Sequence, residues 1–337
     1  MKLDEIRYCP GTLAEGYNAY SPACLRNVFN NRKVSHILSY GQPKLDESVA
    51  EMFMENRRRI SISGVQEKIS LILEKNHLRL TKEGEHGTYI LKPIPRDLKK
   101  IEQVPANEHL TMQISAQVYG LKTAANALIF FNDGTPAYIT KRFDVKPDGG
   151  KWGKEDFATL AEKTKDNAGV NFKYDCSYEE LGHLIQKYVP AWRIEIEKYF
   201  SLVLFNYLFS NGDAHLKNFS LLETPAGDYT LSPAYDLINT RLHVADTDFA
   251  LDKGLFADSF RSEISRMTGH AHKTDFMEFG KRIGVGEKRL EKLIMPFLMK
   301  QPEVEKLISH SFLNESCKKA YQLNYNTKRN YLNRHSF

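Results

Sequence analysis

The sequence is poor in cysteine, and its cysteines lack the spacing of a metal site. The 337 residues include 4 cysteines, with no C-x-x-C pair and no histidine pair at zinc-finger spacing. This pattern argues against structural zinc and indicates free thiols in a reducing compartment. The residues are Cys9, Cys24, Cys176 and Cys317, and we interpret the first two as buried thiols.

Long hydrophobic runs are also missing. The amino-terminal stretch MKLDEIRYCPG has no apolar segment of the kind found in secretory signal peptides. No uninterrupted apolar run approaches the roughly 20 residues that cross a bilayer as a helix. We therefore expect a soluble cytoplasmic protein without membrane contact. Repeats of fixed period and low-complexity tracts do not stand out either.

The composition is that of a globular protein. Hydrophobic residues make up 42% of the chain and charged residues 26%, which is enough apolar material for two domains or two lobes. The net charge of +5 arises from 47 basic and 42 acidic residues. An excess this small permits contact with nucleic acid or phosphorylated ligands but does not identify one.

The first half of the chain carries strand patterns. Residues 60–94 alternate β-branched or apolar residues with polar ones and contain two turn signals, which predicts three short antiparallel strands. Residues 104–121 place apolar side chains at helical spacing. Residues 126–144 predict a hairpin around Asn132-Asp133-Gly134.

Helical patterns dominate the second half. They include a long apolar stretch at residues 194–209, and residues 218–239 then predict a hairpin that ends in Tyr235-Asp236. The change from strand to helix patterns lies near residues 144–155. We therefore expect an α+β chain with a sheet-rich part, residues 1–148, and a helical part, residues 149–337.

The stretch SISGVQEK, residues 61–68, is a candidate phosphate-binding loop. Small hydroxyl residues and one glycine between two strands let backbone N–H groups approach an anion closely. An ordinary Ser/Gly turn would have the same composition. The G-x-x-x-x-G-K-[ST] motif is absent, which argues against a P-loop nucleotidase.

Lys92 ends the apolar strand TYILK and is followed, one helix later, by Asn107-Glu108. A lysine that points into a cleft can hold phosphates as a point charge, and a glutamate on a neighbouring helix can keep it in place. Lysines in strands are more often exposed edge residues, so this residue alone does not decide between the two interpretations.

The stretch NGDAHLKNF, residues 211–219, gathers the polar residues most typical of a reaction centre. Asp213 and Asn218 have the D-x-x-x-x-N spacing with which kinases place a catalytic aspartate and a magnesium-binding asparagine. Asp236 follows eighteen residues after Asn218, where a second metal ligand is expected. A metal site built on His215 is not favoured, because no second histidine or cysteine lies at ligand spacing.

Six motifs together resemble the HipA family of bacterial serine/threonine kinases, the toxins of HipBA-type toxin–antitoxin modules. They occur in the family order over residues 60–238, as ISISGVQEK, YILKP, NEH, KRFD, NGDAHLKNFS and LSPAYDL. The chain departs from conventional protein kinases, because H-R-D does not precede the loop and Asp236 is followed by Leu-Ile rather than Phe-Gly.

The resemblance implies a two-lobed kinase-like fold that uses ATP and magnesium. It implies that Asp213 is the catalytic aspartate, that Asn218 and Asp236 bind magnesium, and that Lys92 binds phosphate. The remaining nucleotide contacts that it implies are Ser63, Gly64, Val65, Gln66, Glu67 and Lys68 at the phosphates, Lys141, Arg142 and Phe143 at the hinge beside adenine, and His215 and Tyr235 flanking the nucleotide.

The resemblance also implies partners and regulation. Full-length members carry about a hundred further residues before the phosphate loop, whereas about sixty precede it here, as in the short HipT form. That form works with a separate small HipS-like protein and a HipB-like DNA-binding antitoxin, so contact with DNA would be indirect. Family members phosphorylate aminoacyl-tRNA synthetases, and they autophosphorylate loop serines at the positions of Ser61 and Ser63. Phosphate there would repel the phosphates of ATP.

Three alternatives remain open from the sequence. A kinase-fold protein can bind nucleotide and act only as a regulatory module, and an autokinase assay would separate the two. A small-molecule kinase of related fold would label a metabolite rather than a polypeptide. Residues 279–294 faintly resemble a DNA-binding helix-turn-helix, although their leucines also fit a core face.

Overall fold

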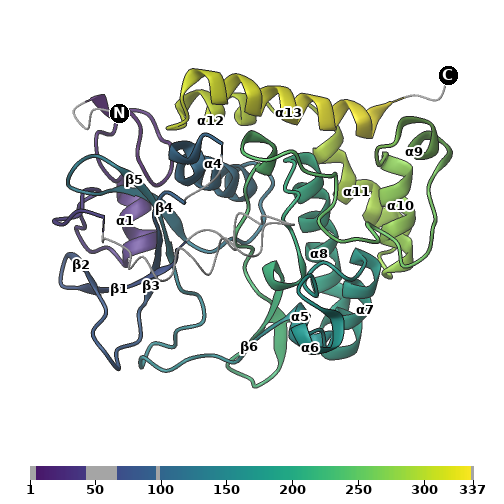
Figure 1. Ribbon diagram of the computed structural model, residues 1–337, viewed down its shortest axis with the longest axis horizontal. Helices are drawn as coiled ribbons and strands as arrows, with labels where there is room; N and C mark the ends of the chain where they lie inside the picture. The colour runs from purple at the N-terminus through teal and green to yellow at the C-terminus, as the bar shows by residue number, and fades with distance from the viewer. Residues whose placement is uncertain (1–4, 43–66, 96–98, 335–337) are drawn as a thin grey trace.

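A computed structural model describes residues 5–42, 67–95 and 99–334 of the chain. Figure 1 shows a two-lobed α+β molecule, with a five-stranded sheet in one lobe and a group of helices in the other. Part of the expected phosphate loop lies outside the described residues, namely Ser61, Ser63, Gly64, Val65 and Gln66.

The sheet-rich lobe is built on antiparallel strands in the order β2-β1-β3-β5-β4. The sequence prediction of three short strands within residues 60–94 and of a hairpin around Asn132-Asp133-Gly134 is confirmed. The strands are β1 (Ile69–Glu74), β2 (His77–Leu80), β3 (Tyr89–Lys92), β4 (Asn126–Phe130) and β5 (Pro136–Lys141).

The two faces of this sheet pack against different helices. Ala127 and Ile129 of β4 lie in a core with helix α1 (Pro22–Phe29), whereas Leu128 lies in a larger core with α4 (Val104–Gln117). This division follows from the alternation of side chains along a strand. Helix α4 confirms the helix expected over residues 104–121, and it ends earlier because Gly120 takes a left-handed φ of 63°.

The helix-rich lobe is centred on α8 (Trp192–Leu208), which confirms the helix expected from the apolar stretch at residues 194–209. The packing partners of α8 are α7 (Tyr178–Tyr188), α11 (Glu287–Leu298) and α13 (Glu315–Asn333), and α10 (Lys273–Arg282) packs on α11. The smaller helices are α5 (Phe157–Leu160), α6 (Lys165–Ala168) and α9 (Glu263–Thr268). Among the described helices, none is long and apolar enough to cross a bilayer.

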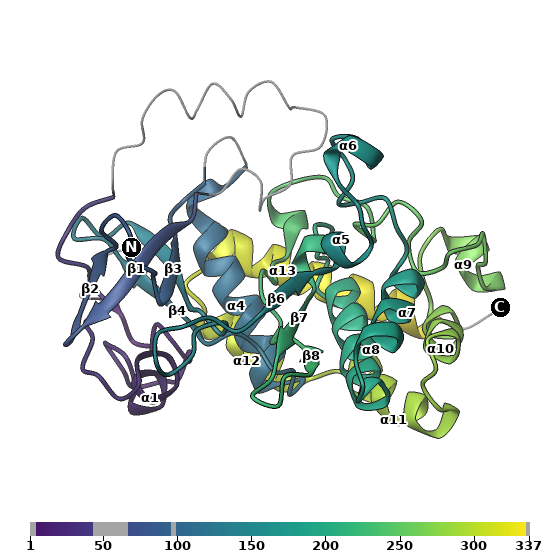
Figure 2. The same ribbon diagram turned by 90° about the horizontal axis from the view of Figure 1, so that it is seen from below.

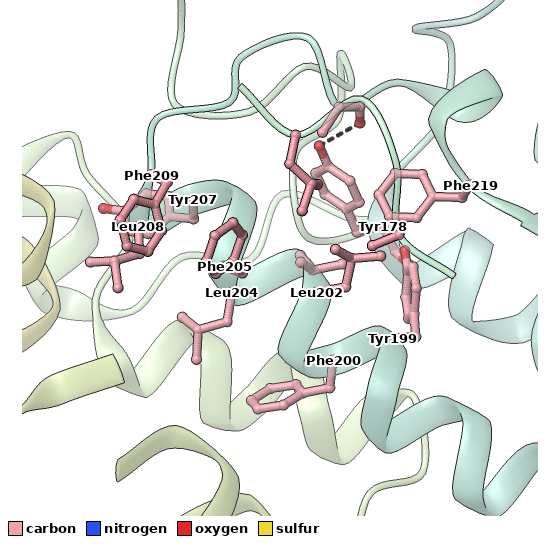
Figure 3. Close-up of a cluster of buried hydrophobic side chains, with 14 of the residues drawn as sticks. Tyr178, Tyr199, Phe200, Leu202, Leu204, Phe205, Tyr207, Leu208, Phe209 and Phe219 are labelled. Carbon is pink, nitrogen blue, oxygen red and sulfur yellow. Dashed lines mark hydrogen bonds between the residues drawn. The ribbon is translucent and has the colours of Figure 1, made fainter. Parts of the chain in front are cut away.

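Aromatic side chains anchor the loop that follows α8. Figure 3 shows Tyr178, Tyr199 and Phe219 packed together beside this helix. The ring centroids of Tyr199 and Phe219 lie 5.6 Å apart in an edge-on arrangement, which is favourable for aromatic pairs. The hydroxyl of Tyr178 donates to the carbonyl oxygen of Ala214 at 2.9 Å. The stretch NGDAHLKNF is therefore fixed to the core of the lobe.

A small sheet continues from this loop. It consists of β6 (Lys154–Asp156), β7 (Ser220–Glu223) and β8 (Tyr229–Leu231), paired antiparallel in the order β6-β7-β8. The hairpin β7–β8 confirms the second hairpin expected from the sequence. A 3-10 helix, η3 (Leu216–Asn218), lies between the loop and β7.

The carboxyl-terminal helices join the two lobes. Helix α12 (Pro302–His310) packs on α4, while α13 packs on α8, on α11 and on the 3-10 helix η4 (Thr240–Leu242). Figure 2 shows α12 and α13 extending behind both lobes. The chain passes from the large sheet to β6 between residues 141 and 154, and the boundary at residue 148 stays a prediction.

The resemblance to a helix-turn-helix has a packing explanation. Helices α10 and α11 are joined through Gly284, and Leu290 and Ile294 of α11 are buried in the main core. Arg289, one of the basic residues of α11, pairs with Glu197 of α8 at 2.5 Å. The leucine pattern thus reflects a core face.

Candidate active site

Lys92 lies at the centre of a buried ionic cluster between the lobes. It ends β3, where its side chain is 4% exposed, and its Nζ donates to Glu108 Oε1 of α4 at 2.6 Å. The same Nζ donates to Asp236 Oδ1 at 2.5 Å. A charge this deeply buried is stable only when it is paired, so the structure excludes the interpretation of Lys92 as an exposed edge residue.

Asp236 is held in an unusual conformation after β8. Its φ of 57° lies in the left-handed region, which is uncommon for a residue with a side chain and recurs at functional sites. Burial alone would raise the pKa of its carboxyl, but the positive charges of Lys92 and Lys68 outweigh burial and hold the pKa well below its usual range. Asp236 is therefore ionised at neutral pH.

Glu108 behaves differently from Asp236 within the same cluster. Burial raises the pKa of its carboxyl to about 7, against the opposing effect of Lys92. The cluster thus contains one carboxylate that is firmly ionised and one that is close to its titration point at neutral pH. Both carboxyl groups contact the same ammonium of Lys92.

Asn218, the last residue of the D-x-x-x-x-N stretch, contacts Asp236. Asn218 Nδ2 lies 3.4 Å from Asp236 Oδ2, while Asn218 Oδ1 accepts the backbone N–H of His215 at 3.2 Å. The D-x-x-x-x-N stretch and Asp236 are therefore brought together, as the motif predicted. Lys68 adds a further cation, with its Nζ 3.5 Å from Asp236 Oδ2.

Asp213 lies on the far side of the same loop. Its exposed fraction is 8%, and its Oδ1 accepts the hydroxyl of Tyr174 at 3.1 Å. The neighbouring backbone is also fixed, because the N–H of Gly212 donates to the hydroxyl oxygen of Thr240 at 2.9 Å. This carboxylate is thus oriented by groups outside its own loop while one edge remains open to a cavity.

His215 packs between Asp213 and Tyr174. Its Nε2 lies 3.8 Å from Asp213 Oδ1, and its ring meets that of Tyr174 edge-on, with centroids 5.3 Å apart. Burial and the nearby charge of Lys173 lower the pKa of His215 to about 3. The imidazole is therefore neutral at physiological pH, and a supporting role at the nucleotide stays a prediction.

The oxygen donors at this position suit magnesium. Magnesium prefers hard oxygen ligands and usually takes one or two from protein, with water and phosphate supplying the others. The carboxylate of Asp236 could provide one such oxygen, and Asn218 could provide a second if its amide oxygen turned from the N–H of His215 toward Asp236. Within residues 5–42, 67–95 and 99–334, no group of three or more His, Cys, Asp or Glu residues could hold a metal by itself.

The expected hinge residues have separate environments. Lys141 Nζ donates to Asn30 Oδ1 at 2.6 Å, and Arg142 pairs with Asp144 at 2.7 Å. Phe143 instead packs on Tyr235, with ring centroids 5.7 Å apart. Of the three, only Phe143 contacts a residue adjacent to Asp236.

The expected phosphate loop is described only at its end. Glu67 and Lys68 lie immediately before β1, and of these two Lys68 reaches the ionic cluster. The placement of residues 61–66 relative to Lys92 is therefore a prediction from the sequence, not an observation.

Sequence patterns did not predict the role of Tyr174 or the buried network around Asn107. Asn107 Nδ2 donates to the carbonyl oxygen of Asn239 at 2.8 Å, and it also lies 2.9 Å from Nε2 of His243. This network links α4 to the segment after Asp236. Pairing across more than a hundred residues leaves no periodic signal, although Asn107 was visible as the first residue of the NEH motif.

Comparison with known proteins gives a consistent assignment. The family model of the HipA-like C-terminal domain matches residues 60–304. A kinase homologue from Haemophilus influenzae is 25% identical over 316 residues, covering 89% of this chain and 88% of that protein. The serine/threonine-protein kinase toxin HipA of Shewanella oneidensis is 25% identical, covering 56% of this chain and 45% of the toxin. This chain thus matches less than half the length of that toxin.

Solved structures support the fold. HipA of Shewanella oneidensis, solved with HipB and its operator DNA, matches with a TM-score of 0.61 at 20% identity, covering 87% of this chain and 74% of HipA. The proinflammatory kinase CtkA of Helicobacter pylori matches with a TM-score of 0.50 at 14% identity, covering 76% and 90%. Because the family model spans most of the chain, this protein belongs to the family of the HipA-like C-terminal domain.

Proposed function

We propose that this protein is an ATP-dependent serine/threonine protein kinase that requires magnesium. One observation carries the proposal: Lys92 is paired with both Glu108 and Asp236, and Asp236 lies against Asn218 of the D-x-x-x-x-N loop. Kinases need this convergence of a phosphate-binding lysine with metal-binding oxygens beside a catalytic aspartate.

Each of these residues would have a separate role in phosphoryl transfer. Asp213 would orient the acceptor hydroxyl and receive its proton, while Lys92 would hold the phosphates of ATP. Magnesium on Asn218 and Asp236 would neutralise charge on the transferred phosphoryl group. Most of the rate enhancement would then come from positioning and electrostatics rather than from covalent chemistry.

Replacement of Asp213 by Asn tests the proposal. We expect D213N to lose phosphate transfer by a factor of about a thousand or more, because the group that receives the proton is gone. The measurement is transfer of labelled γ-phosphate to protein, together with circular dichroism to verify folding. D166N, which removes one exposed charge from α6, is the matched control and should retain full activity. Phosphate transfer by D213N at the wild-type rate would contradict the proposal.

We also propose a toxin role with an antitoxin partner. The relative from Shewanella oneidensis is named a toxin and was solved with HipB and operator DNA. By analogy, this chain would pair with a HipB-like antitoxin and meet DNA only through it, and a short HipT-like chain would also bind a HipS-like protein. A gel shift in which the lone chain binds DNA as tightly as its mixture with the antitoxin would contradict indirect binding.

The proposed target is an aminoacyl-tRNA synthetase. Phosphoproteomics of cells that express wild-type protein or D213N would identify it. The relevant phosphorylation sites are those that appear with the wild-type protein and not with D213N. Asp213-dependent phosphorylation confined to unrelated proteins would remove the synthetase from the proposal, and labelling of a metabolite alone would favour a small-molecule kinase.

Autophosphorylation of Ser61 or Ser63 belongs to the same proposal. Each phosphate would bring nearly two negative charges close to the phosphates of ATP and thereby weaken nucleotide binding. Mass spectrometry of the protein after incubation with ATP would detect the modification. If both serines remain unmodified in an active preparation, this mode of regulation does not operate.

A further inference from the structure

A large cavity opens beside the catalytic loop, and Lys92 is not part of its wall. Its volume is about 1020 Å³, and its wall includes Gly212 and Asp213 together with much of the segment at residues 244–256. This volume is at the upper end of the range for small-molecule sites. The cavity can therefore accept an extended segment of a protein, with the acceptor hydroxyl at Asp213.

The carboxylates on the cavity wall differ in how they are neutralised. Asp248 is paired with three basic side chains, namely Arg241 at 2.7 Å, His270 at 2.7 Å and Lys328 at 2.5 Å. Asp275 accepts the backbone N–H of Ser262 at 2.7 Å and that of His272 at 2.9 Å. Both groups are occupied by structural contacts within the lobe.

Asp246 has no such close salt bridge among the described residues. The guanidinium of the adjacent Arg241 pairs with Asp248 instead, although its charge still lowers the pKa of Asp246. The hydroxyl of Thr240 forms a side-chain hydrogen bond with Asp246 that lowers its pKa, and this hydroxyl also lies 2.8 Å from the carbonyl oxygen of Ser210. Burial raises the pKa of Asp246 and outweighs the opposing effects of Thr240 and Arg241.

Asp246 is also close to the reaction centre. A Cβ atom placed on Gly212 would lie only 2.6 Å from Cβ of Asp246 and 2.8 Å from its Oδ2. Asp246 therefore packs directly against the residue that precedes Asp213. The absence of a side chain at Gly212 is what allows Asp246 to pack this close to the loop that carries Asp213.

We propose that Asp246 is a specificity-determining residue that binds a lysine or arginine beside the acceptor hydroxyl of the protein substrate. This inference rests on the proposed kinase function and names the substrate feature that the same site recognises. Neighbouring residues of an extended chain are 3.8 Å apart, and alternate residues are about 7 Å apart on one face. A substrate that places its hydroxyl at Asp213 would thus bring the side chain one or two positions away to Asp246.

The energetic argument favours a cation from outside the molecule. A partly buried carboxylate without a close salt bridge costs free energy, and a substrate cation that pairs with it recovers part of that cost during binding. A neutral or acidic neighbour would leave Asp246 unpaired or repel it. Charge complementarity at this point therefore discriminates between substrates that share the same acceptor residue.

A matched set of serine peptides tests the proposal. The peptides carry Lys, Gln or Glu one or two positions from the serine, and kcat/KM for phosphate transfer is measured with wild type, D246N, D246K and D166N. We expect wild type and D166N to prefer Lys over Gln by about tenfold or more, which corresponds to about 1.4 kcal/mol. D246N should reduce this ratio to near one, and D246K should prefer Glu.

The outcomes separate this inference from the proposed function. If wild type labels itself in an Asp213-dependent manner but shows no preference for basic peptides, the assignment to Asp246 is wrong. It is also wrong if D246N lowers kcat equally for all peptides, because Asp246 would then only support Gly212. If the wild-type protein transfers phosphate to no polypeptide, including itself, the result contradicts the proposed kinase function rather than the role of Asp246 alone.

Discussion

At the scale of single residues, the site depends on a few buried polar groups that come from distant parts of the chain. Asp236 adopts a left-handed φ of 57° and receives Lys92 from the other lobe. Asp213 is oriented by the hydroxyl of Tyr174, which lies outside the catalytic loop. Each functional group is therefore held by a partner whose removal should change its chemistry without unfolding the protein.

Tyr174 offers a precise test of this arrangement. Y174F keeps the ring that packs on His215 but removes the donor to Asp213. We expect kcat to fall about tenfold, because a hydrogen bond to a charged group contributes roughly 1.5 kcal/mol or more. We also expect the acidic limb of the pH–rate profile to move to higher pH, because a carboxylate that loses a donor binds a proton more readily.

The pH profile distinguishes positioning from a merely structural role. A structural role would lower the amount of folded protein and leave the shape of the profile unchanged. An unshifted acidic limb in Y174F, measured with the KM for ATP unaltered, would show that Tyr174 does not act through Asp213.

At the scale of elements, close contact between helices fixes the lobe that carries the catalytic loop. Gly182 of α7 packs on Ile283 just after α10, and a Cβ at Gly182 would lie 2.5 Å from Ile283 Cγ2. Tyr178, one turn earlier on α7, donates to Ala214 within the catalytic loop. A displacement of α7 would therefore be transmitted to the loop that holds Asp213.

Two opposing effects meet in G182A. Alanine favours a helix by about 1 kcal/mol relative to glycine, whereas overpacking typically costs 1–3 kcal/mol. Because the clash is with a β-branched side chain, we expect a net loss of about 1–2 kcal/mol of unfolding free energy, measured by urea denaturation.

A neighbouring variant supplies the control for that measurement. His183 is exposed on the same helix, so H183A should change the unfolding free energy by less than about 0.5 kcal/mol. If G182A were more stable than the wild-type protein, α7 and α10 would be able to move apart enough for the added methyl group without loss of unfolding free energy.

At the scale of the whole molecule, the first part of the chain and the last helices hold the lobes together. His109 of α4 is fully buried, and its Nε2 lies 3.2 Å from the carbonyl oxygen of Gly11. His310 of α12 approaches the same turn, with Nδ1 3.0 Å from the carbonyl oxygen of Leu13. The turn around residues 9–15 is thus held between α4 and α12.

This arrangement predicts how stability depends on pH. Burial lowers the pKa of His109 to about 4, from 6.5. The folded state therefore binds fewer protons than the unfolded state between these values. The contribution of neutral His109 to the unfolding free energy is thus complete above pH 6.5 and is lost as the pH falls to 4. We expect His109 to account for up to about 3 kcal/mol of that loss.

Substitution by glutamine isolates this contribution. H109Q preserves a donor for Gly11 but cannot be protonated, so its unfolding free energy should fall less steeply than that of wild type between pH 6.5 and 4. Urea denaturation of both proteins at several pH values gives the comparison. Parallel curves for the two proteins would show that His109 does not remain neutral in the folded state.

Much of the fold could be predicted from local sequence patterns. The strands within residues 60–94, the hairpin at residues 126–144 and the apolar helix at residues 194–209 follow from periodicity and turn residues, which act over a few positions. The D-x-x-x-x-N loop and its relation to Asp236 were visible for the same reason, because spacing within a loop is a local property.

Other features were decided only by the tertiary structure. The pairing of Lys92 with Asp236 joins residues 144 positions apart, and the orientation of Asp213 by Tyr174 joins residues 39 positions apart. Periodicity does not encode such contacts, because burial in a shared core brings these groups together. The sequence by itself determined the elements and the chemical type of the site. Folding decided which charges are paired, because the partners of Lys92 and Asp248 come from distant parts of the chain.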